Sequence, residues 1–232
     1  MKTHKRDQHG RFVVSLPVKE HMMKRLGNLK EIAIQRFKSL ERRFKRDPQL
    51  KVEYSKFIHE YLALRHMREF TNSVDNLWPH FYMPHYCVIK TASSTTKLRV
   101  VFDVSCKSST GILLNDTLML GPVLQQELIS ILLRFRTYKY VLTSDIEKMY
   151  RQIKVDAEQT SLQRIVWRND PSENIKTYEL LTLTYGTVPA SFIATKVIQQ
   201  LADLEAHKFP KGAAAAYKDF YVDDFISGAL TH

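Results

Sequence analysis

The apolar side chains in the first third of the chain recur every three or four residues, a spacing that predicts amphipathic helices. A short strand-like stretch at Phe12–Leu16 stops at Pro17 and precedes this pattern. The pattern then runs through Met22, Leu26, Leu29, Ala33, Phe37, Leu40 and Phe44. Asp47 and Pro48 next predict an N-cap followed by proline at the first helical position. The second helix carries Val52, Phe57, Tyr61, Leu62 and His66, and we expect the two helices to pack together with a basic outer face.

From residue 84 onward the pattern changes to the alternation of β-strands. Residues 85–105 predict two strands joined by a polar turn, with Leu98, Val100, Phe102 and Val104 on one face of the second. Further strands are predicted at 138–145, on both sides of Asp170-Pro171, and at 219–228. Helices are predicted from Gly121-Pro122 to Phe135 and from Pro189 to Leu204. This order indicates an α+β fold, in which an antiparallel sheet is covered by helices on one face.

Composition indicates a globular protein. The chain has 232 residues, of which 44% are hydrophobic, so it is long enough to bury a core. No apolar run approaches the ~20 residues that span a bilayer, and the N-terminus lacks the apolar core of a secretory signal. Cys87 and Cys106 form neither a CxxC motif nor a disulfide framework. We therefore expect structural thiols in an intracellular protein, cytoplasmic or nuclear, without a membrane partner.

The net charge of +11 is concentrated in one part of the chain. Residues 1–100 contain 21 Lys and Arg against 9 Asp and Glu, whereas residues 101–232 contain 14 against 15. A basic N-terminal part attracts polyanions such as nucleic acid, although a solvated basic surface explains the same counts.

Three aspartates stand where strands end. Asp223 and Asp224 lie inside the apolar stretch "DFYVDDFISG", which predicts a hairpin with both carboxylates at its tip. Taken alone the pair fits a surface turn, and Asp145, at the end of another strand, fits a helix N-cap. If the two strands are neighbours, all three carboxylates reach one edge of the sheet and can hold two Mg²⁺ or Mn²⁺ ions. Such a site suits phosphoryl transfer, with Asp145 and Asp223 as bridging ligands.

Four motifs around these residues occur together: "KLRVVFDVS", "LTSDIEKMYRQI", "TYGTVPASFIAT" and "YVDD". In this order they resemble the reverse transcriptase of retroelements. More narrowly, "RFVVSLPVKE" and "KLRVVFDVSCKSSTGILLNDTLMLGPVLQ" resemble the Bel/Pao class of long-terminal-repeat retrotransposons. The resemblance runs from about Arg11 to the C-terminus.

The resemblance implies the fingers and palm of a right-hand polymerase. Residues 84–232 correspond to fingers and palm, with an antiparallel palm sheet covered by helices, and residues 1–83 form a basic helical region before them. Only eight residues follow Asp224, so the thumb is expected to be missing. The chain is accordingly expected to be a polyprotein fragment with little activity alone.

The resemblance also implies roles for single residues. Asp145, Asp223 and Asp224 are the catalytic and metal-binding carboxylates, and the carbonyl of Ile146 is a further metal ligand. Tyr150 crowds the 2′-carbon of the sugar and so favours deoxynucleotides. A plain core tyrosine remains the alternative for Tyr150.

Three more positions match nucleotide contacts. Arg99 corresponds to the arginine that grips the triphosphate, and Lys90 is the companion phosphate ligand. Gly186 lets the backbone approach the nucleotide closely. An exposed strand arginine and a strand-end glycine are the alternatives. Tyr185 stands where the retroviral form has glutamine, and Asp103 and Asn115 match family positions without an assigned catalytic role.

The implied activity is RNA-directed DNA synthesis. The partners would be an RNA or DNA template with its primer, together with deoxynucleoside triphosphates, and the oligomeric state stays open. A decayed retroelement copy that only binds nucleic acid through its basic helices is the alternative. A metal-dependent nuclease using the same carboxylates has no motif in its favour.

Overall fold

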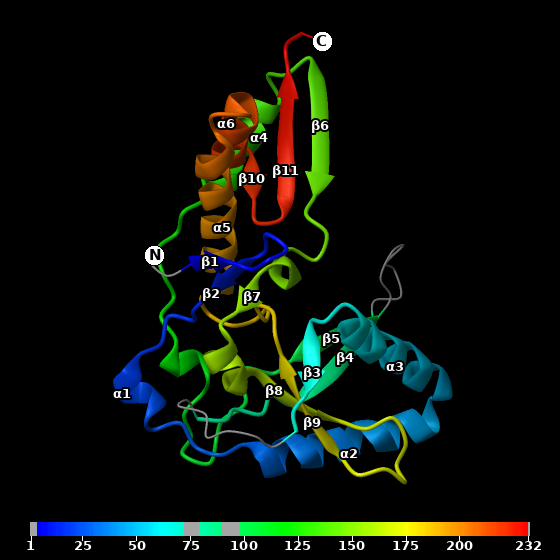
Figure 1. The fold of residues 1–232 in the computed structure, drawn as a ribbon. Coiled ribbons are helices and arrows are strands. Elements are labelled where there is room, and N and C mark those ends of the chain that lie inside the picture. The colour runs from blue at the N-terminus through cyan, green and yellow to red at the C-terminus, as the bar shows by residue number, and fades with distance from the viewer. Residues whose placement is uncertain (1–3, 72–78, 90–97, 232) are drawn as a thin grey trace.

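A computed structural model gives the structure of residues 4–71, 79–89 and 98–231 (Figure 1). The fold is α+β, as predicted, but its strands form several small sheets where one larger sheet was expected. In Figure 1 one of these sheets, with α4, α5 and α6 beside it, occupies the upper part of the molecule, and α2 and α3 lie at the bottom. The segment between β4 and β5, which contains Lys90, lies outside the described residues.

Four sheets are found in the described part of the chain, and all strand pairs are antiparallel except β2 with β7. The first contains β1 (His4–Arg6), β2 (Phe12–Val14) and β7 (Lys154–Val155). The second contains β3 (Met67–Glu69), β9 (Lys176–Leu180) and β8 (Arg164–Trp167). The third is the hairpin of β4 (His85–Ile89) and β5 (Leu98–Phe102). The fourth contains β10 (Phe220–Tyr221), β11 (Asp224–Ala229) and β6 (Tyr140–Asp145).

The helices are α1 (Glu20–Met23), α2 (Lys30–Arg46), α3 (Pro48–Ala63), α4 (Leu128–Phe135), α5 (Ala190–Glu205) and α6 (Pro210–Lys218). The predicted start of α3 is confirmed, because Asp47 accepts a hydrogen bond from the Leu50 amide at 3.0 Å and Pro48 is the first helical residue. The first predicted helix is wrong in one respect. The helical pattern is interrupted over residues 24–29, between the end of α1 at Met23 and the start of α2 at Lys30, where the Asn28 side chain accepts from the Lys30 amide at 2.8 Å.

The helix predicted from Gly121 begins only at Leu128, because the preceding residues make tertiary contacts in place of helical ones. Gly121 has φ +79° and lies against the ring of Phe192, so close that a Cβ would not fit. The carbonyl of Leu124 accepts a hydrogen bond from the Gln199 side chain at 3.3 Å. Helix α6 was not predicted, since its run of alanines lacks an apolar stripe.

An aromatic cluster forms the centre of the core between α2, α3 and β8. Tyr54 stacks on Trp167 at 5.5 Å between ring centroids, and Phe37 packs against the same indole at 5.4 Å. His85 is buried among them; Tyr54 donates to its Nδ1 at 2.5 Å and its Nε2 donates to the Val166 carbonyl at 2.8 Å. The core is continuous across residue 84, and the division of the chain at that point stays a prediction.

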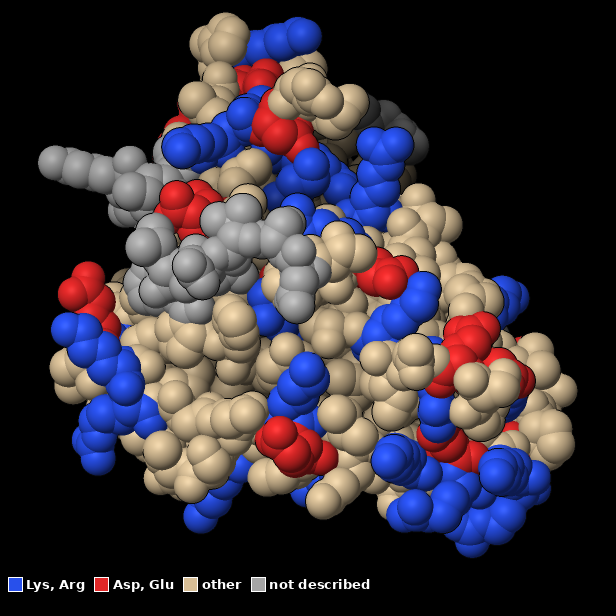
Figure 2. All heavy atoms as spheres, turned by 60° about the horizontal axis from the view of Figure 1, so that its bottom comes forward, with Lys and Arg blue, Asp and Glu red and all other residues tan. Residues whose placement is uncertain are grey.

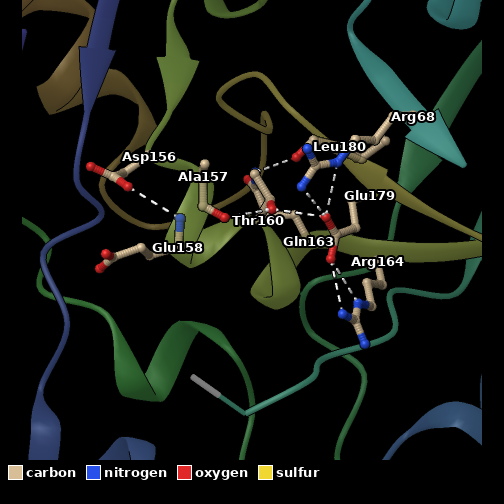
Figure 3. Close-up of polar contacts among 9 residues, drawn as sticks. All are labelled: Arg68, Asp156, Ala157, Glu158, Thr160, Gln163, Arg164, Glu179 and Leu180. Atoms are coloured by element: carbon tan, nitrogen blue, oxygen red, sulfur yellow. Dashed lines mark hydrogen bonds and ion pairs between the residues drawn. The ribbon is translucent and has the colours of Figure 1, made fainter. Parts of the chain in front are cut away.

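A buried ionic network ties β3, β8 and β9 together (Figure 3). Glu179, whose side chain is 1% exposed, accepts two hydrogen bonds from Arg164 at 2.9 and 3.1 Å. Arg68 donates to its other carboxylate oxygen at 2.9 and 3.3 Å, and the Thr160 hydroxyl adds a bond at 3.0 Å. Burial by itself raises the pKa of Glu179, but these hydrogen bonds outweigh it, so the pKa is lowered and the carboxylate is charged.

Both cysteines are buried free thiols, as predicted. Burial raises the pKa of Cys87 and of Cys106, which makes both unreactive. None of the helices among the described residues is long and apolar enough to cross a membrane.

Candidate active site

Strands β6 and β11 bring the first and the last predicted carboxylates together. The two strands pair antiparallel over six residues, and in this register Asp145 lies directly opposite Asp224. Partners in an antiparallel pair have Cβ atoms about 4.5–5.5 Å apart on the same face of the sheet. Residues separated by 79 positions in the sequence are therefore neighbours at the edge of one sheet.

The turn between β10 and β11 places Asp223 beside this pair. Tyr221 pairs with Asp224, so that Val222 and Asp223 form the tip of the hairpin. Val222 has φ +58°, an uncommon conformation for a β-branched residue, and its amide donates to the side chain of Gln125 at 3.2 Å. The carbonyl of Asp223 accepts from the Ile146 amide at 3.0 Å, which joins the tip to the residue after Asp145.

The electrostatics of this edge reflect three crowded carboxylates. Partial desolvation and then the negative charges of Asp223 and Asp224 raise the pKa of Asp145. All the candidate ligands are oxygen atoms, which suits a hard cation, and a cation would relieve this repulsion. Among the described residues, however, no three carboxylate, histidine or cysteine side chains are gathered tightly enough to form a ready-made metal site. The oxygen donors of Asp145, Asp223 and Asp224 suit Mg²⁺ in their chemistry.

The segment after Asp145 leads into the predicted sugar-binding position. Ile146, the predicted carbonyl ligand, accepts a hydrogen bond from the Met149 amide at 3.1 Å. Tyr150 lies in the 3₁₀ helix Met149–Gln152, and its hydroxyl is 3.3 Å from that of Ser191 on α5. This contact fixes the ring between two elements.

A groove of about 1170 Å³ lies next to the hairpin tip. Its lining includes Asp223, Tyr150, Arg99 and Tyr185, which come from four separate segments of the chain. Arg99 is exposed on β5, opposite Val88, with its side chain available to a ligand in the groove. The structure thus collects three predicted site residues at one groove.

Gly186 has φ +88°, so the glycine is required by the backbone itself. Asn115 fastens this turn: its side-chain amide donates to the Gly186 carbonyl at 3.1 Å, and its oxygen accepts from the Val188 amide at 2.9 Å. The turn before α5 is therefore held by a residue that was assigned no catalytic role from the motifs. Asp103 forms an ion pair with Arg36 at 3.7 Å, away from the aspartates.

Tyr185 uses its hydroxyl within the protein. It donates to the carbonyl of Val100 on β5, and its ring packs against Phe102 at 5.7 Å. Burial raises the pKa of Tyr185, so the hydroxyl stays protonated. Where the retroviral form has a glutamine, this chain has a link between the Gly186 turn and the strand that carries Arg99.

One residue of the site, Glu60, could not be recognised from the sequence. Glu60 on α3 lines the groove and binds two cations from the segment after Asp145: Lys148 at 2.7 Å and Arg151 at 3.2 Å. No local pattern connects an acid in an amphipathic helix with residues 88 and 91 positions away.

Comparison with solved structures identifies the kind of fold. The structure of the foamy viral protease-reverse transcriptase in complex with an RNA/DNA hybrid matches with a TM-score of 0.56 and 18% identity, over 79% of this chain. The crystal structure of the prototype foamy virus protease-reverse transcriptase CSH mutant matches with a TM-score of 0.54 and 20% identity, over 80%. The chain has a reverse transcriptase-like fold.

The matched region covers 20% of each foamy virus chain. No protein-family model matches the sequence, and no curated protein matches it. The assignment of the fold therefore rests on similarity of structure alone.

Proposed function

We propose that the chain is the fingers and palm part of a Bel/Pao-class RNA-directed DNA polymerase, which adds deoxynucleotides to a primer 3′-hydroxyl. The observation that carries this proposal is the register of β6 and β11, which sets Asp145 opposite Asp224 with Asp223 at the adjoining tip. The reverse transcriptase-like fold supports the same assignment.

The residues of the chain have distinct tasks in this reaction. Asp145, Asp223 and Asp224 would hold two Mg²⁺ ions, which when bound activate the primer hydroxyl and stabilise the leaving pyrophosphate. Arg99 would bind the triphosphate through its planar guanidinium, and Tyr150 would exclude a ribose 2′-hydroxyl. Both residues line the same groove, and the hydroxyl of Tyr150 is 3.3 Å from that of Ser191.

A nucleic-acid partner is supported by the basic face of α2. Seven cations of this helix are exposed: Lys30, Arg36, Lys38, Arg42, Arg43, Lys45 and Arg46. Figure 2 shows clusters of Lys and Arg side chains on the side of the molecule that comes forward from the bottom of Figure 1, where α2 lies. Phosphate contacts from such a surface give affinity without base specificity. The same basic surface is equally consistent with the alternative function, a module that binds nucleic acid without synthesising DNA.

Binding of Mn²⁺ distinguishes the two functions without requiring turnover. We expect electron paramagnetic resonance to show Mn²⁺ bound by the chain with dATP, and Asp145→Asn or Asp223→Asn to abolish that binding. Glu31→Gln, on the exposed face of α2, is the charge-matched control and should change nothing. In a longer protein that also carries a thumb, incorporation opposite an RNA template should be lost in the same two variants, while duplex affinity measured by fluorescence anisotropy is kept. Mn²⁺ binding that is indifferent to Asp145 and Asp223 contradicts the polymerase assignment.

A further inference from the structure

The segment between Asp145 and Tyr150 contains a backbone conformation that needs support. Lys148 has φ +53° and ψ +41°, in the left-handed region that side chains other than glycine rarely adopt. It lies three residues after one proposed catalytic aspartate and two before the proposed sugar-contacting tyrosine. Strained residues of this kind persist where surrounding contacts hold them.

Glu60 supplies those contacts from α3. The same carboxylate oxygen, Oε1, accepts from Lys148 Nζ at 2.7 Å and from Arg151 Nη1 at 3.2 Å. The two cations stand on either side of Met149 and Tyr150, so that one acid clamps both ends of the turn. The hydrogen bond from Lys148 is the main reason why the pKa of Glu60 is lowered.

Arg151 is held on a second side by aromatic rings of α3. Its guanidinium lies 4.5 Å from the ring centroid of Tyr61 and 5.6 Å from that of Phe57. The two aromatic rings already restrict the guanidinium of Arg151. Pairing with the Glu60 carboxylate therefore costs little further side-chain entropy. The link between α3 and the segment after Asp145 is therefore well ordered.

We propose that Glu60 is a positioning residue of the nucleotide groove. By holding Lys148 and Arg151 it fixes the left-handed turn, and through the turn it sets where Tyr150 meets the sugar. Glu60 does not itself contact the reacting atoms. The effect on sugar choice rests on the proposed function, whereas the clamp on residues 146–152 rests on the contacts alone.

Hydrogen–deuterium exchange on the 232-residue chain tests the clamp directly. In Glu60→Gln, amides in residues 146–152 should exchange roughly fivefold faster, as expected from weakening a partly exposed charge-assisted hydrogen bond. Glu53→Gln is the matched control, because Glu53 lies on the same helix and, within the described part of the chain, its side chain bonds Gln49 at 3.4 Å and neither Lys148 nor Arg151. Protection in β8 and β9 reports that both variants are folded. Unchanged exchange in residues 146–152 of Glu60→Gln overturns the proposal.

Calorimetric binding of dATP and ATP in Mn²⁺ tests the consequence for the sugar. We expect the preference for dATP to fall roughly fivefold in Glu60→Gln and to stay unchanged in Glu31→Gln, which lies on the exposed face of α2 outside the groove lining. A general loss of stability would weaken the binding of dATP and of ATP equally. The ratio of the two dissociation constants therefore reports the positioning of Tyr150 separately from stability. If the unmodified chain binds neither nucleotide, the polymerase assignment fails while the exchange result still decides the clamp. A preference that is the same in all three proteins overturns the role in sugar choice.

Discussion

Replacing Glu179 by glutamine should destabilise the protein more than any other single charge removal in the β3–β9–β8 sheet. The substitution keeps the shape of the side chain but removes the charge that balances Arg164, whose side chain is 1% exposed. The side chain of Arg68 is 54% exposed and can turn toward water, so its charge stays solvated when Glu179 is replaced by glutamine. The main loss is thus one buried guanidinium left without its carboxylate.

The expected size of this loss is about 3–5 kcal/mol, the usual result of breaking a buried ion pair by removing one partner. A matched control exists on the same sheet, where Glu69 pairs with Lys176 at 3.0 Å and both side chains are more than 40% exposed. Glu69→Gln should cost no more than about 1 kcal/mol, because water already solvates that pair.

Urea unfolding followed by circular dichroism at pH 7 measures both free energies. Arg164→Met combined with Glu179→Met should recover much of the loss, since the unpaired charge disappears with its partner. Equal, small effects of Glu179→Gln and Glu69→Gln would refute the argument that the buried network stabilises this sheet.

Three further outcomes are expected. Burial lowers the pKa of His85 from 6.5 to about 4. Between pH 6.5 and pH 4 the unfolded chain therefore binds a proton at this residue that the folded chain does not. The free energy of unfolding has its full value above pH 6.5 and falls by about 3 kcal/mol as the pH approaches 4. Comparing the urea midpoints from pH 7.5 to 4.5 with those of His85→Gln separates this fall from that of His66, whose pKa burial also lowers to about 4; the same pH dependence in both proteins would contradict the prediction. Tyr185→Phe removes the hydrogen bond to Val100 and should cost about 1 kcal/mol, seen as a melting temperature about 2–4 °C lower. Arg99→Lys keeps the charge but loses the planar fork, so the Kd for dATP should rise about tenfold in calorimetry; an unchanged Kd would place the triphosphate elsewhere.

Much of the secondary structure could be predicted because its signals are local. The cap at Asp47, the strand that ends at Asp145 and the alternation around Val100 each depend on neighbouring residues. The interruption at Gly27 and the late start of α4 depend on distant partners instead. Single-sequence patterns do not contain that information.

The residues of the candidate site show the same division between local sequence signals and contacts with distant partners. Asp145 and Asp223 could be singled out because each stands where a predicted strand ends, whereas Arg99 was singled out only through the resemblance of its motif to the reverse transcriptase family. Glu60 was not singled out and Asn115 was given no role, since their contacts are hydrogen bonds to segments 71 to 91 residues away. Only the folded arrangement shows that these two side chains support the turns around the groove.

The pairing of β6 with β11 constrains the lengths of these two strands as much as their amino-acid composition. Side chains alternate between the faces of a strand, so losing or gaining one residue between Tyr140 and Ser144 would turn Asp145 to the opposite face or shift it past Asp224. Exposed positions such as Val141 can change freely by comparison. Among descendants of this sequence, a single in-frame codon deletion in β6 should therefore abolish function more reliably than most substitutions there.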